Sequence, residues 1–115
     1  MSIRLNKNFL HVKGDVLVLE YVFEDVGNLN TMTKNVNNGI VWRAKDNTNN
    51  IITKDKTTGI EIHSENPSMC TVTLDPADTS SLEAKQYTYQ LRVLDLNSNP
   101  VTVAIGTMDL RESFF

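Results

Sequence analysis

Apolar and polar residues alternate with a period of two along most of this chain, and this feature limits its fold more than any other. The alternation recurs in VLVLEYVF at residues 16–23 and in the runs at 40–45, 69–74 and 87–94. Successive side chains of a β-strand point to opposite faces, so this pattern is typical of strands, and no convincing amphipathic helix interrupts it. Seven to eight short strands at this spacing predict an all-β protein with an antiparallel β-sandwich.

The length of 115 residues predicts a single domain, which can bury about two-thirds of its unfolded surface. We expect the sandwich to span residues 1–110, followed by a C-terminal tail at 111–115, with no linker and no internal repeat. Because residues 16–23 are apolar on both faces, we expect this strand to lie at the centre of its sheet. Residues 8–12 and 51–54 are weaker candidates, suited to sheet edges.

Two connections have recognisable turn chemistry. Residues 51–54 and 60–63 are predicted to pair as a hairpin, with Gly59 at a positive-φ position between them. Residues 25–39 are rich in Asn and Gly, and we expect a loop there with at most a short strand.

The segment DPADTSSLEAK at residues 75–85 separates two strands and is too long for a tight hairpin. Asp75, Pro76 and Asp78 suggest an N-cap, a proline at the first helical position and an acid near the exposed amides. We therefore predict one short helical turn near 76–82 that crosses from one sheet to the other. Tyr87 or Tyr89 is then expected to donate a hydrogen bond back to the crossing backbone, as in a tyrosine corner.

The charge pattern excludes some classes of partner. Eleven Lys and Arg residues are scattered among fourteen acids, with a net charge of −3, so we expect no nucleic-acid binding. No apolar run approaches 20 residues, so we expect no membrane insertion, and the start of the chain resembles an intracellular N-terminus. Cys70 is the only cysteine; it is expected to be a buried apolar residue without a disulfide.

No constellation of residues predicts catalysis. His11 and His63 have no Cys or acid at ligand spacing, so we expect neither a metal nor a cofactor. Residues 46–57 lack the glycine and the terminal acid of a calcium loop. Asp75 and Asp78 are explained by helix capping. We therefore expect no enzymatic activity.

Three aromatic residues remain as candidates for packing or binding. Trp42 lies on an alternating strand, where it is either a core anchor between the sheets or a platform for a sugar ring. Phe114 and Phe115 follow charged residues at the end of the chain. They pack on the domain's own flank, dock into a partner or remain disordered; docking makes them the candidate partner-binding residues.

The stretch LDPADTSSLEAKQYTYQLRVLD at residues 74–95 resembles the immunoglobulin-like domains of tailed-phage virion proteins, in particular the N-terminal domains of baseplate upper proteins. Gly14, Trp42, Gly59 and Gly106 agree with the same pattern, whereas the glycine that commonly precedes the Tyr pair is missing. The resemblance implies an immunoglobulin-like sandwich and a non-enzymatic structural component of a bacteriophage particle. A tail, baseplate or adaptor protein is expected first, and a capsid decoration protein is the next expectation, by a narrow margin.

The resemblance also implies a location and partners. The chain is expected in the virion, assembled in the bacterial host cytoplasm, where it would contact other virion proteins as an oligomer. The alternative is a carbohydrate-binding module for surface attachment, in which Asn37, Asn38 and Asn49 would bind a glycan.

Overall fold

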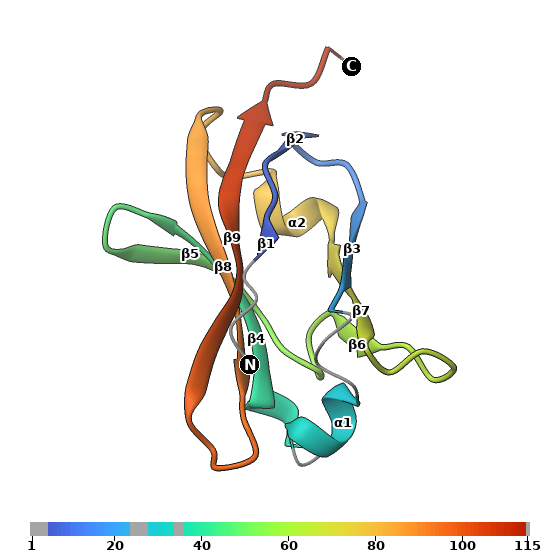
Figure 1. Ribbon diagram of the computed structural model, residues 1–115. Coiled ribbons are helices and arrows are strands. Elements are labelled where there is room, and N and C mark those ends of the chain that lie inside the picture. The colour runs from blue at the N-terminus through green and yellow to red at the C-terminus, as the bar shows by residue number, and fades with distance from the viewer. Residues whose placement is uncertain (1–4, 24–27, 34–35, 115) are drawn as a thin grey trace.

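The computed structural model describes residues 5–23, 28–33 and 36–114, and within them the chain forms a β-sandwich (Figure 1). The elements in chain order are β1 (Leu5–Asn6), β2 (Phe9–Val12), β3 (Leu17–Val22), α1 (Leu29–Met32), a 3₁₀ turn (Asn37–Gly39), β4 (Ile40–Asp46), β5 (Asn49–Lys54), β6 (Ile60–Ile62), β7 (Met69–Leu74), α2 (Pro76–Thr79), β8 (Gln86–Leu94) and β9 (Pro100–Arg111). The predicted all-β sandwich with one short crossover helix is confirmed.

The described strands form two sheets. The larger is six-stranded, in the order β1-β9-β8-β4-β5 with β2 also on β9, and the smaller is three-stranded, in the order β3-β7-β6. β1 and β2 run parallel to β9, and the remaining pairs are antiparallel. In Figure 1 the β4–β5 hairpin projects to the side, away from the smaller sheet, and α1 lies at the end of the sandwich opposite the C-terminus. No helix among the described residues is long and apolar enough to cross a membrane.

Trp42 is the centre of the core between the two sheets, as the core-anchor alternative predicted. Its side chain is fully buried on β4. Its ring stacks on Tyr89 of β8 with centroids 5.2 Å apart, and its indole N–H donates to the Tyr21 hydroxyl of β3 at 3.2 Å. Trp42 therefore joins a strand of each sheet through both packing and a buried hydrogen bond.

The segment between β7 and β8 crosses from the smaller sheet to the larger one. The backbone N–H of Asp75 donates to Asp78 Oδ2 at 2.7 Å, within a capping box at the start of α2. The Tyr87 hydroxyl donates to the Glu83 carbonyl at 2.6 Å, so Tyr87 forms the predicted corner. Tyr89 donates to the Lys7 carbonyl and thereby fixes the N-terminal strands instead.

The prediction that residues 16–23 form a central strand is wrong. Within the described part of the chain, β3 pairs only with β7 and is an edge of the smaller sheet. Its inward side chains, Leu19 and Tyr21, enter the core, whereas Val18 and Val22 on the other face are exposed. Valine favours strands through its branched side chain whether or not a second layer covers it, so the apolar outer face did not indicate burial.

The predicted hairpin of residues 51–54 with 60–63 is also wrong. β5 pairs with β4 in the larger sheet, and β6 pairs with β7 in the smaller one. The turn between them is local: the Asp55 carbonyl accepts from the N–H groups of Thr58, Gly59 and Ile60. Gly59 has φ +153° as expected, but its turn sends the chain to the opposite sheet.

The predicted edge strands and the predicted Asn-rich loop can also be compared with the structure. The predicted edge positions of 8–12 and 51–54 are confirmed, because β2 and β5 lie at opposite sides of the larger sheet. The loop expected at 25–39 contains α1 and the 3₁₀ turn in its described part, while residues 24–27 and 34–35 lie outside the described residues.

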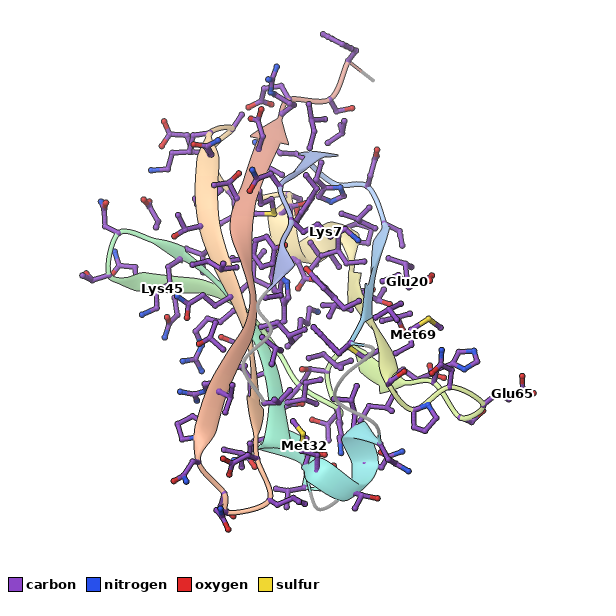
Figure 2. The ribbon with its side chains drawn as sticks, in the orientation of Figure 1. Lys7, Glu20, Met32, Lys45, Glu65 and Met69 are labelled. Carbon is purple, nitrogen blue, oxygen red and sulfur yellow. The ribbon has the colours of Figure 1, made fainter. Side chains whose placement is uncertain are left out.

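Lys7, between β1 and β2, contacts both sheets. A Cβ at Gly106 would lie 2.0 Å from the Lys7 carbonyl oxygen, so only glycine allows β9 to approach this segment. Lys7 Nζ donates to the Glu20 carbonyl of β3 at 2.9 Å (Figure 2). Lys7 therefore bridges the larger sheet to the edge of the smaller one.

Candidate functional site

A groove of about 410 Å³ lies on the outer face of the larger sheet, away from the core. Its walls come from three neighbouring strands: Val41, Arg43 and Lys45 of β4; Thr88, Tyr89, Gln90 and Arg92 of β8; and Ile105, Gly106 and Thr107 of β9. Figure 2 labels Lys45 on the side of this sheet opposite to β3, β6 and β7.

The strand register determines which side chains reach the groove. Across β4 and β8, Val41 is opposite Arg92, Arg43 is opposite Gln90, and Lys45 is opposite Thr88. The alternate residues point into the core. A strand has a side-chain period of two, so the pattern that buries Trp42 also places Arg43 on the outer face.

Two irregularities in the pairing lie beside the groove. The β4–β5 register shifts between Ala44 and Lys45, and the β8–β9 register shifts between Leu91 and Arg92. A β-bulge bends its strand and increases the local twist. We attribute the hollow of this face to these two shifts.

Three cations give the groove its charge. Arg43, Lys45 and Arg92 are lining residues, and no Asp or Glu is among the residues that line the groove. None of the three has a carboxylate partner in the part of the chain that the structure describes. The groove is therefore a positive region on a chain whose net charge is −3.

Three basic residues outside the groove are each paired with an acid. Lys13 pairs with Glu112 at 3.3 Å, Lys85 with Asp46 at 2.9 Å, and Arg111 with Asp109 at 2.8 Å; these three pairs lie outside the lining of the groove. Arg43 is held instead by a neutral group, because its Nε donates to Thr53 Oγ1 of β5 at 3.3 Å. This hydrogen bond leaves the terminal guanidinium nitrogens available to an anion.

The three cations lie in a row. Arg92 is level with Val41 in the register, and Arg43 and Lys45 follow two and four residues further along β4. At about 3.3 Å per residue, the row advances roughly 7 Å per cation and roughly 13 Å in total. Such a row suits an elongated anionic ligand, because a compact anion cannot contact all three side chains.

The candidate residues named from the sequence do not form this groove. Phe114 is 99% exposed beyond the end of β9, so it does not pack on the domain's flank; Phe115 lies outside the described residues. Asn37 and Asn38 precede β4, whereas Asn49 follows its far end, so the structure does not bring them together.

Sequence reasoning missed Arg43, Lys45 and Arg92. The signal that could have found them is the spacing of Arg43 and Lys45 at i and i+2 on one face of a strand. Arg92 joins them only through the β4–β8 pairing, which the sequence alone does not fix.

Cys70 is buried in the core on β7. Burial raises the pKa of the Cys70 thiol to about 12, so this thiol is protonated and inert at neutral pH. Among the described residues, no group of three or more His, Cys, Asp or Glu side chains could hold a metal ion.

His11 on β2 is buried, and its Nε2 has no hydrogen-bond partner among the described residues. Desolvation lowers its pKa below 6.5, although Asp15 opposes part of this shift. A lowered pKa means that the unfolded state binds the proton more readily. The contribution to stability is therefore present above about pH 6.5 and is lost as the pH falls through the pKa of the folded state.

We accordingly predict that the free energy of unfolding decreases between pH 7.5 and pH 5, and that His11→Gln reduces this decrease. Urea denaturation of both proteins at the two pH values measures the difference, with His63→Gln as the matched control. An unchanged pH dependence in the His11 variant would contradict the prediction.

Comparison with known proteins adds information about the fold. No protein-family model and no curated protein matches this chain. Among solved structures, it is similar to the crystal structure of CopC from Methylosinus trichosporium OB3b. The TM-score is 0.50 and the sequence identity 16%, and the alignment covers 99% of this chain and 91% of that one. At this identity the similarity shows the β-sandwich fold and no shared ligand.

The function expected from residues 74–95 must be corrected. The similar structure is a CopC protein and not a phage protein, so the assignment as a structural component of a bacteriophage particle is wrong. The reason lies in the motif itself. Asp75, Asp78 and Tyr87 form a helix cap and a corner between sheets. These are structural devices of a sandwich crossover, and they carry no information about a partner.

Proposed function

We propose that this chain is a non-enzymatic binding module that holds an anionic partner on the outer face of its larger sheet. The observation that carries the proposal is the groove of about 410 Å³, in which Arg43, Lys45 and Arg92 line up without a carboxylate among the lining residues. Uncompensated cations in a concave site attract anions, because the walls exclude solvent and concentrate the field.

The chemistry of the lining supports binding rather than catalysis. The hydroxyl and amide groups of Thr88, Gln90 and Thr107 can orient a ligand through hydrogen bonds. The lining residues include no histidine or acid that could act as a base for those hydroxyls. The two guanidinium groups can each bind a carboxylate or a phosphate through two parallel hydrogen bonds.

The proposal predicts that binding of simple anionic polymers depends on the three cations. The probes are a fluorescein-labelled oligoglutamate peptide and inorganic polyphosphate, measured by fluorescence anisotropy and by competition. The triple variant Arg43→Gln, Lys45→Gln, Arg92→Gln should bind about tenfold more weakly or worse, because each exposed charge pair contributes up to about 1 kcal/mol. Affinity should also fall as the salt concentration rises from about 50 mM to about 500 mM.

A charge-matched control separates the groove from the overall charge of the chain. Lys13→Gln, Lys85→Gln, Arg111→Gln removes the same number of cations from sites where each is already paired with an acid. This control should change the affinity by less than about threefold. If both triple variants lose affinity equally, or if neither probe binds the unmodified protein, the proposed function is wrong.

A further inference from the structure

We infer that the occupant of the groove is an extended segment of a partner protein that carries carboxylates on alternate residues. This inference rests on the proposed anion-binding function and specifies the chemistry of the partner. The segment would lie as a strand over β4 and β8, with its acidic side chains directed at Arg92, Arg43 and Lys45.

The spacing of the cations is the first argument. Arg92, Arg43 and Lys45 are offset by two residues each in the β4–β8 register. An extended peptide has the same repeat, about 6.6–7 Å between side chains on one face. Acids at positions i, i+2 and i+4 would therefore each lie opposite one cation. Consecutive acids would direct every second carboxylate away from the sheet.

The composition of the groove between the cations is the second argument. Gln90 lies at the middle of the row, between Arg43 on β4 and Ile105 on β9. Its amide has both donors and acceptors for a peptide backbone. Val41 and Ile105 are half-buried apolar lining residues that offer contacts to the aliphatic part of Glu or Asp side chains.

The lining also favours a peptide over a single-stranded nucleic acid. Sites for single strands combine cations with exposed aromatic rings on which bases stack. The aromatic lining residue is Tyr89, whose side chain is buried in the core with 1% exposure.

The test compares two peptides of identical composition. One alternates three glutamates with serines (Ser-Glu-Ser-Glu-Ser-Glu-Ser), and its isomer has the glutamates together (Ser-Ser-Glu-Glu-Glu-Ser-Ser). The full chain should bind the alternating peptide about fivefold more tightly, because the isomer loses one or two ion pairs that each contribute up to about fivefold. Lys45→Gln should reduce this preference to less than about twofold, because the remaining Arg92 and Arg43 are offset by two residues and the first and third glutamates of the isomer can pair with both.

The outcomes distinguish this inference from the proposed function. Equal affinity for the two isomers, with binding still lost in the groove triple variant, would overturn the extended register and leave anion binding intact. Tighter binding of an oligothymidylate than of either peptide would overturn the peptide class. Failure of all anionic probes to bind would overturn the proposed function itself. Backbone amide shifts in nuclear magnetic resonance spectra should centre on Gln90 and Arg43; shifts confined to other faces would overturn the placement.

Discussion

Replacing Trp42 with alanine is expected to lower the free energy of unfolding by about 3–5 kcal/mol. The indole is fully buried between the sheets, stacks on Tyr89 and donates a hydrogen bond to Tyr21. Its removal would leave a large cavity, and the buried Tyr21 hydroxyl would lose its indole donor. Domains of this size typically have only 5–15 kcal/mol of stability in total, so the variant would be close to unfolding. Because the chain has a single tryptophan, urea denaturation should be followed by circular dichroism.

Two matched substitutions test whether the loss comes from packing at this position. Trp42→Phe keeps a ring against Tyr89 but loses the N–H donor, and should cost less than the alanine variant, about 1–3 kcal/mol. Val18→Ala removes a valine whose exposure is 56%, and should change stability by less than about 0.5 kcal/mol. A loss below about 1 kcal/mol for Trp42→Ala would show that the core does not depend on this anchor.

The features that the sequence predicted correctly depend on local chemistry. Asp75 and Pro76 begin a helical turn because a cap and a fixed φ favour it within four residues. The Tyr87 hydroxyl reaches the carbonyl of Glu83, only four residues away. Alternation likewise placed Trp42 inward, because side-chain direction in a strand follows from the backbone alone.

The features that were predicted incorrectly depend on which strands pair. The sequence of residues 51–63 does not indicate that β5 pairs with β4 while β6 pairs with β7. A connection of five residues can close a hairpin or lead to the other sheet. The exposed valines of β3 could equally have been covered by a further layer. Strand pairing and the covering of a strand face depend on how the whole domain buries its apolar surface. Local sequence patterns do not specify this burial.

The groove is the extreme case of this dependence on pairing. Arg43 and Arg92 are far apart in sequence, and they share a face only because Val41 is opposite Arg92 in the register. A shift of the β4–β8 register by one residue would turn the outward side chains of one of these strands toward the core. The charge count alone suggested scattered cations without a site, whereas the fold gathers three of them.

An ion pair between a buried lysine and the crossover helix leads to the second large effect. Lys54 lies on β5, at the edge of the larger sheet, but its side chain points inward and is only 7% exposed. Its Nζ lies 2.8 Å from Asp78 Oδ2 on α2 and 3.8 Å from Asp75 Oδ2. Lys54 thus links the larger sheet to the crossover helix through this ion pair.

Asp78→Asn is expected to lower the free energy of unfolding by about 3 kcal/mol, because it leaves a buried ammonium without its nearest counter-charge. The amide oxygen can still accept the N–H of Asp75, so the helix cap is retained and the charge alone is tested. Adding Lys54→Met to this variant should restore stability to within about 1 kcal/mol of the unmodified protein, because an apolar side chain of similar length needs no partner. Urea denaturation of the two single variants and the double variant completes the cycle. A double variant less stable than Asp78→Asn alone would show that Lys54 stabilises the fold through something other than this ion pair.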